Sequence, residues 1–180
     1  MSEAKERILR AAADAVRESI NQFFDQSVDG MKLGSPIEEL FLLGMIAASA
    51  TGPTVFINPK YDHHIEDATR DVFSVYFALL PQVKIESFRV DFVLKAAMAV
   101  GTGVPGHDFD IHQSCIAIEC DGAAFHHGNP VAAARDKARD RVLAEHFDAV
   151  LRFTGSELNA NAYTCAKQAI TVAEMKLRAV

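Results

Sequence analysis

The sequence has few cysteines, and their number and spacing argue against both disulfide bonds and zinc binding by thiolates. Its three cysteines are Cys115, Cys120 and Cys165, and none belongs to a CxxC pair. An odd number without that spacing argues against a disulfide framework and against a thiolate zinc site. Cys115 and Cys120 lie in or beside an apolar segment, so we interpret both as small apolar side chains of the core.

Long apolar runs are also missing. No segment approaches the ~18 consecutive apolar residues that cross a bilayer. The N-terminus, MSEAKERILR, is charged, and no apolar signal region follows it. We therefore expect no membrane contact and a cytoplasmic location. Hydrophobic residues still make up 49% of the 180 residues, enough for the core of one domain with an extension.

The third missing feature is an excess of positive charge, since the formal net charge is −6. A protein that binds nucleic acid mainly through phosphates usually has a basic excess. The acidic balance therefore counts against an avid nucleic-acid binder. It is compatible with an enzyme that gathers carboxylates around a cation, or with basic residues gathered on one face.

An amphipathic pattern opens the chain. Within residues 3–27, apolar side chains recur every four residues and predict one helix. Asp29-Gly30 predicts a turn, and a connector ends at Gly34. This helix can cover its own core, or it can pair with a protein partner or with a second copy in a homodimer.

The second predicted helix has a clear start. Ser35 can act as N-cap, Pro36 takes the first helical position, and Glu38 completes a capping box. Residues 40–50 are apolar on most sides, so the helix should be buried. Thr51-Gly52-Pro53 ends it.

The rest of the chain alternates strand-like and helix-like segments, which is a mixed α/β pattern. The predicted strands are 54–58, 72–85, 88–94, 115–119 and 149–153, and the predicted helices are 130–147 and 157–180. We expect 115–119 and 149–153 to be buried. Helix 130–147 should direct Val131, Ala134, Ala138, Val142 and Leu143 inward.

Three further sequence features predict a bend, a turn and a loop within this pattern. Pro81 indicates an edge or a bend in its strand. Glu86-Ser87 predicts the tight turn of a hairpin. Residues 95–114 hold three glycines and Pro105, and we predict a long loop there.

Two carboxylates stand out. Asp91 lies between Val90 and Phe92 in an apolar strand, and Glu119 ends another, closely followed by Asp121-Gly122. Carboxylates at strand ends beside a glycine turn can share a hard cation. The alternative is that each is a solvated strand-end residue. Two carboxylates brought close without a cation would repel and raise one pKa.

Four segments carry, in order, a resemblance to a known group: SPIEELF, FRVDFVL, IAIECDGAAFHH and RDKARDRVLAEHFDAVLRFTGSEL. They resemble the PD-(D/E)XK, or restriction-endonuclease-like, superfamily, and within it the very-short-patch-repair-like endonucleases and their small relatives. The resemblance covers roughly residues 35–158, with 54–83 and the predicted loop as poor matches. It implies a restriction-endonuclease-like α/β domain over 35–180, with a mixed central sheet flanked by helices in the order αβββαβ. Residues 1–34 would form an N-terminal helix and connector.

The resemblance also implies metal ligands. Asp91 looks like the family's metal-binding aspartate, and Glu119 takes the (D/E) position of its second motif. Cys120 would offer its backbone carbonyl as a further ligand. Asp121 stands where the motif usually has lysine, and this is a departure because a carboxylate cannot stabilise developing negative charge.

Further roles follow from the same resemblance. The repair-like branch also lacks the lysine and uses a histidine a few residues on, and Phe125-His126 looks like its aromatic–histidine pair. His126 is therefore a candidate general acid/base, or a residue that holds the metal-bound water. Glu38 matches the first-helix glutamate that often completes the metal's outer shell. His127 would be a surface residue or a substrate contact.

Two arginines and four histidines leave alternatives open. Arg135 and Arg139 share a helix face, which is either a solvated face with internal ion pairs or a ridge that contacts phosphates. Arg152 is expected to pair with a carboxylate of the core. The spacing of the remaining histidines fits no standard zinc pattern: His63, His64, His107 and His112.

The implied activity is the hydrolysis of phosphodiester bonds in DNA by an endonuclease that uses Mg²⁺, for which Mn²⁺ can substitute. The first alternative is a non-catalytic member of the same fold that binds nucleic acid or a protein. The second is an unrelated metal hydrolase or small-molecule enzyme.

Overall fold

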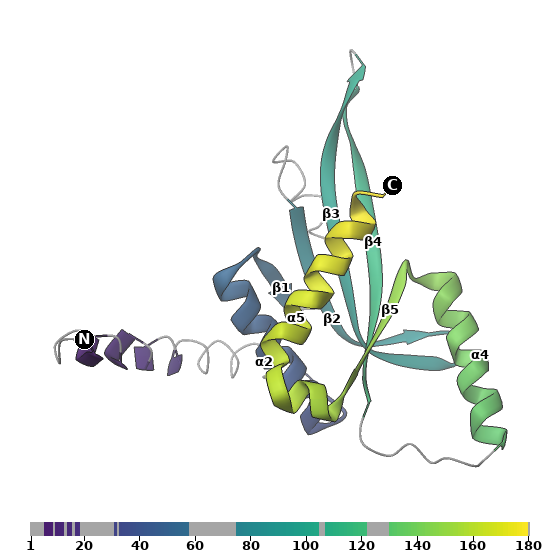
Figure 1. Cartoon of the computed structure of the whole chain (residues 1–180). Helices are drawn as coiled ribbons and strands as arrows, with labels where there is room; N and C mark the ends of the chain where they lie inside the picture. Colours follow the sequence, from purple (N-terminus) through teal and green to yellow (C-terminus); the bar gives the residue numbers. More distant parts are fainter. Residues whose placement is uncertain are drawn as a thin grey trace. The chain divides into compact units, whose positions relative to one another are not determined.

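The computed structural model describes residues 6–8, 10–12, 14–15, 17–18, 31, 33–57, 75–104, 107–121 and 130–179 (Figure 1). Within these, only the backbone is described for 102–104, 107–109 and 130–133. The chain divides into two units, Met1–Lys32 and Leu33–Val180.

The described residues of the first unit are helical between 6 and 18. Arg17 and Asp14 form an exposed ion pair at 3.3 Å, one helical turn apart. This confirms part of the helix predicted for 3–27, and the rest of that range lies outside the described residues. Pairing of this helix with a partner or a second copy stays a prediction.

The second unit contains a five-stranded mixed sheet in the order β1-β2-β3-β4-β5. β1 is parallel to β2, β2 and β4 are antiparallel to β3, and β5 is parallel to β4. The strands are β1 (Val55–Ile57), β2 (Val75–Ile85), β3 (Phe88–Val104), β4 (His107–Asp121) and β5 (Ala149–Thr154). The helices are α2 (Pro36–Thr51), α4 (Pro130–His146) and α5 (Gly155–Leu177). The mixed α/β fold with a central sheet flanked by helices is confirmed.

The helices cover both faces of the sheet. Phe92 of β3 packs on Phe41 of α2, with ring centroids 5.2 Å apart. Its neighbour Val93 points to the other face, where it clusters with Leu143 of α4. α2 and α5 pack against each other, and α5 also contacts β3 and β4 (Figure 1). None of the described helices is long and apolar enough to cross a membrane.

The start of α2 follows the prediction with one correction. Ser35 is the N-cap, and its hydroxyl accepts the Glu38 N–H at 3.4 Å. The return bond predicted from the Ser35 N–H to Glu38 is wrong, because the carboxylate accepts the Gly34 N–H at 2.8 Å instead. A Cβ on Gly34 would lie 2.7 Å from Glu38 Oε1, so the glycine allows this close approach.

The long loop predicted for 95–114 is wrong. β3 continues to Val104 and β4 begins at His107, so most of this range is a β-hairpin paired from Lys95↔Cys115 onward. Its alanines are buried, and the Ser114 hydroxyl donates to the Ala173 carbonyl of α5 at 2.9 Å. Packing on α5 therefore stabilises strands in a segment whose glycines lie towards the tip of the hairpin.

Pro81 marks both an edge and a bend. β1 pairs only with Phe77–Leu79, so Pro81 lies on a part of β2 that β1 does not reach. The next residue, Gln82, has φ 54°, and no pair is formed there with Asp91, which lies opposite. The predicted turn at Glu86-Ser87 is confirmed, and Glu86 has φ 51°.

Two burial predictions need correction. Among the five residues expected to point inward from α4, Leu143 is fully buried and Ala134 is exposed. Ala138 and Val142 are half-buried, and the Val131 side chain is not described. β5 is an edge strand, so only Phe153 is buried among the residues expected to be, whereas 149–151 are half-buried and Arg152 is exposed.

Gly44 provides a test of the α2–α5 packing. A Cβ at this position would lie 2.4 Å from the Ala162 carbonyl oxygen, a backbone atom that cannot simply turn away. We expect Gly44→Ala to lower the free energy of unfolding by about 1–3 kcal/mol, measured by urea denaturation. Ala50→Ser, at an exposed site on the same helix, should change it by less than about 0.5 kcal/mol. Equal stability of Gly44→Ala and wild type would contradict this packing.

Candidate functional site

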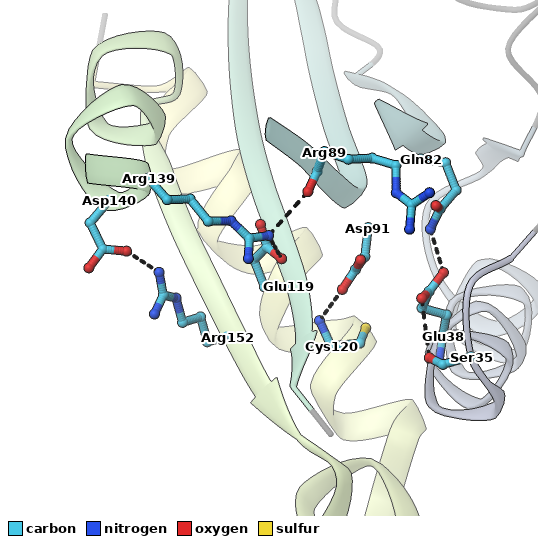
Figure 2. Close-up of polar contacts among 10 residues, drawn as sticks. All are labelled: Ser35, Glu38, Gln82, Arg89, Asp91, Glu119, Cys120, Arg139, Asp140 and Arg152. Carbon is cyan, nitrogen blue, oxygen red and sulfur yellow. Dashed lines mark hydrogen bonds and ion pairs between the residues drawn. The ribbon is translucent and has the colours of Figure 1, made fainter. Parts of the chain in front are cut away.

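Two acidic residues lie at the end of the ladder between β3 and β4. Phe92 and Ile118 form the last pair of the ladder, and Asp91 and Glu119 are the next residue on each strand. The Cys120 N–H donates to Asp91 Oδ2 at 2.8 Å, which ties the aspartate to the neighbouring strand (Figure 2). The antiparallel register therefore brings together two acidic residues that lie far apart in the sequence.

Glu119 is held from the other side by Arg139. The Glu119 side chain is only 3% exposed, and Arg139 Nη2 of α4 donates to its Oε2. The same Nη2 donates to the Arg89 carbonyl at 3.1 Å. Within the described residues, Glu119 Oε1 and Arg139 Nε are buried and have no hydrogen-bond partner. The ion pair is thus incomplete on both sides.

Glu38 forms a third acidic position, on α2. It is buried and accepts hydrogen bonds from the Gly34 N–H, the Ser35 hydroxyl and the Gln82 side-chain amide. Figure 2 shows Asp91 in the region between Glu119 and Glu38, with Arg89 and Gln82 close to Glu38. Three donors hold the Glu38 carboxylate in one orientation.

Burial dominates the electrostatics of these acids. It raises the pKa of Glu119 to about 7, against the lowering effect of Arg139, and Asp91 raises it further. Burial also raises the pKa of Asp91, although the Cys120 N–H and Arg139 counteract it. The pKa of Glu38 is raised by burial, and the Asp91 charge adds to that rise. Asp91 therefore repels both neighbouring acids, and a cation between them would relieve this repulsion.

The donor set fits a hard cation. Carboxylate oxygens are the ligands that Mg²⁺ prefers, and the unpaired Glu119 Oε1 is available in the buried site. No group of three or more His, Cys, Asp or Glu side chains close enough to hold a metal occurs among the described residues. A cation held by Asp91, Glu119 and the Cys120 carbonyl therefore stays a prediction.

The remaining predicted residues fall into two groups. Asp121 ends β4 half-buried, and its charge contributes to the raised pKa of Asp91. His112 is half-buried on β4. The other histidines and the aromatic partner lie outside the described residues, or have no described side chain: Phe125, His126, His127, His63, His64 and His107.

Arg135 and Arg139 have different environments, which their shared helix face in the sequence did not indicate. Arg135 is exposed, whereas Arg139, one turn further along α4, reaches the buried Glu119. The expectation that Arg152 pairs with a core carboxylate holds only in part, because its charge lowers the pKa of the buried Glu119 but its ion pair is elsewhere. It pairs with Asp140 on α4, and both side chains are about half exposed because β5 is at the sheet edge.

Two residues near the acids were missed by the sequence analysis. Gln82 carries no motif, and its position depends on a bend that only the folded strand has. Arg89 lies two residues before Asp91 in FRVD, and its charge lowers the pKa of Asp91 and Glu38. The spacing of Arg89 from Asp91 was a usable signal, whereas Gln82 had none.

The chain was also compared with known proteins, and no protein-family model, curated protein or solved structure matched it. The functional interpretation therefore depends on the site described above and on the resemblance of its motifs.

The raised pKa of Glu119 has a testable consequence for stability. The native carboxyl holds its proton to a higher pH than the unfolded one, so the native state loses stability as pH rises from 4.5 to about 7. Glu119→Gln cannot titrate. We expect the unfolding free energy of wild type to fall relative to Glu119→Gln by on the order of 2–3 kcal/mol between pH 5 and pH 8.

Urea denaturation in the presence of a chelator measures this difference. The exposed Glu145→Gln of α4 is the matched control and should follow the wild-type pH dependence. Parallel curves for wild type and Glu119→Gln would show that the native carboxyl is not perturbed.

Proposed function

We propose that the protein is a divalent-cation-dependent endodeoxyribonuclease that hydrolyses phosphodiester bonds, repair- or restriction-like in character. The observation that carries this proposal is that Asp91 and Glu119 are the next residues after the terminal Phe92–Ile118 pair of the β3–β4 ladder, where the Cys120 N–H donates to Asp91 Oδ2. Asp91 and Glu119 are the two residues that the PD-(D/E)XK resemblance marks as metal ligands. Their raised pKa values support a site designed for a cation.

The order of the elements supports the same proposal. The sequence α2, β2, β3, β4, α4, β5 contains the αβββαβ order that the resemblance implies, with β1 and α5 as additions. Asp91 lies on the second and Glu119 on the third strand of that set. A restriction-endonuclease-like core accounts for both positions.

Asp91 and Glu119 would hold the cation through carboxylate oxygens, with the Cys120 carbonyl as the further ligand. When bound, Mg²⁺ or Mn²⁺ supplies a lowered pKa for a coordinated water and positive charge beside the leaving oxygen. In the reaction the water oxygen bonds to phosphorus, the phosphorus–oxygen ester bond breaks, and the leaving oxygen takes up a proton.

Glu38 is better suited to completing the outer shell of the metal than to accepting a proton. Its two oxygens already accept three hydrogen bonds, from Gly34, Ser35 and Gln82. A carboxylate held in this way is less available as a base. The proton acceptor in this proposal is therefore His126, as the resemblance implies.

DNA is the proposed substrate, although the protein is acidic overall. α4 places the side chains of Arg135, Lys137 and Arg141 in solvent. Among its acidic residues, Asp140 is neutralised by Arg152. This helix lies beside the acidic site through Arg139, so its exposed basic side chains are candidates for phosphate contacts.

A second candidate function is a non-catalytic member of the same fold that binds nucleic acid or a protein. Two observations favour it. Asp121 stands in the lysine position, and Arg139 already gives Glu119 a positive partner. Such a protein would keep the fold and the surface while lacking turnover.

Plasmid cleavage tests the proposal. Wild-type protein with Mg²⁺ or Mn²⁺ should convert supercoiled plasmid to nicked circles. Asp91→Ala should reduce the rate by at least ~10²-fold, because even outer-shell changes at metal sites cost 10–100-fold. Asp136→Ala, an exposed aspartate of α4, is the control and should cleave like wild type. Cleavage by Asp91→Ala at the wild-type rate would place the activity elsewhere, and DNA binding without nicking would favour the second candidate.

The position of the cation can be located directly. Crystals soaked in Mn²⁺ should show an anomalous peak between the Asp91 and Glu119 carboxylates. A peak among His63, His64 and His112 instead would favour the alternative that the protein is a metal hydrolase unrelated to these nucleases.

A further inference from the structure

The Arg139–Glu119 ion pair is unusual for a buried pair because it leaves polar atoms unused. Arginine and carboxylate usually form two parallel hydrogen bonds, and buried charges are stable only when their remaining atoms are satisfied. Here Arg139 donates to only one of the two Glu119 carboxylate oxygens, Oε2. Glu119 Oε1 and Arg139 Nε stay buried and unpaired within the described residues. Arg139 is therefore an imperfect partner for this carboxylate.

Arg139 is also much less deeply buried than the carboxylate that it contacts. Its side chain is 29% exposed, and its other hydrogen bond is to the Arg89 backbone carbonyl. Leu143 is the only fully buried side chain on the described part of α4. In Figure 2 the guanidinium approaches Glu119 from the α4 side, whereas Asp91 lies on the other side of Glu119.

We propose that Arg139 is an internal competitor for the divalent cation: a cation held by Asp91 and Glu119 requires the guanidinium to release Glu119. This inference rests on the proposed function. A divalent cation and a guanidinium a few ångströms apart in a buried site repel each other strongly. The cation and Arg139 would also share the single negative charge of Glu119. Occupation of the site by the cation and the Arg139–Glu119 bond are therefore antagonistic.

The release gives Arg139 a second role. A free guanidinium has five donors in a planar fork, the geometry that binds phosphate. When the cation takes Glu119, Arg139 becomes available to a phosphate of the nucleic acid on the α4 side. Binding of the cation and binding of the phosphate then favour each other, as linkage requires.

A purely structural ion pair makes the opposite prediction. If Arg139 only supported Glu119, its loss would misplace a metal ligand and weaken cation binding. Arg139→Gln keeps an amide that can donate to Glu119 but removes the charge, so it separates the two cases. Arg135→Gln, at the exposed position one turn earlier on α4, is the matched control.

The test is Mn²⁺ binding, measured at pH 8 by titration calorimetry and by electron paramagnetic resonance. We expect Arg139→Gln to bind Mn²⁺ at least ~5-fold more tightly than wild type, within the usual range of coupling between sites. Arg135→Gln should bind like wild type, and Asp91→Ala should not bind. Equal or weaker binding by Arg139→Gln would overturn the competitor role and leave the proposed metal site standing. Absence of Mn²⁺ binding in wild type and in Arg139→Gln would overturn the proposed function, and this inference with it.

A second measurement decides the matter even if Arg139→Gln does not fold. The Arg139 Nε–Hε signal in the NMR spectrum of wild-type protein, assigned with Arg139→Lys, should shift on titration with Mg²⁺, while that of Arg135 stays in place. An Arg139 signal unchanged at saturating Mg²⁺ would overturn the proposal.

Discussion

The antiparallel pairing of β3 with β4 is the constraint on which the acidic site depends. It brings Asp91 and Glu119 to the same end of the ladder, where the Cys120 N–H bond to Asp91 ties β4 to β3. A shift of one residue in this register would send Glu119 to the opposite face, away from Arg139. The pairing continues far beyond the site, and α5 stabilises it by contacting both strands and by accepting the Ser114 hydroxyl bond at the Ala173 carbonyl. The geometry of the carboxylates is thus maintained by contacts distant from them.

The second constraint is electrostatic. Glu38, Asp91 and Glu119 all have raised pKa values because the fold buries them, and the nearby guanidinium groups of Arg89 and Arg139 compensate only part of the negative charge. Proteins rarely keep acids together in this way for stability alone, since burial of charge costs free energy unless it is paired. Strongly perturbed acids are typical of functional sites. The incomplete Arg139–Glu119 pair joins the same pattern, because it leaves a buried carboxylate oxygen open.

Sequence signals were reliable where the residues of a short segment determine its local structure, as at helix ends and tight turns. Ser35 and Thr51-Gly52-Pro53 bound α2, and the two-residue turn at Glu86-Ser87 joins β2 to β3. The failures occurred where packing overrides composition. Residues 95–114 look like a loop because of their glycines, yet pairing between β3 and β4 and contact with α5 make most of them a hairpin. Ala134 fits the apolar stripe of α4 but is exposed, whereas Leu143, further along the helix, packs into a core cluster with residues of the sheet.

For the site, the sequence by itself determined which acids to consider: Asp91 and Glu119 are set apart by their apolar surroundings, by the order of the motifs and by the glycine that follows Asp121. The tertiary structure alone decided their partners. Gln82 reaches Glu38 through a bend in β2, and Arg139 rather than Arg135 reaches Glu119. The physical reason is that the energy of a charge or hydrogen bond depends on distance in space. That distance is set by strand register and by the placement of α4, neither of which is encoded in any one segment.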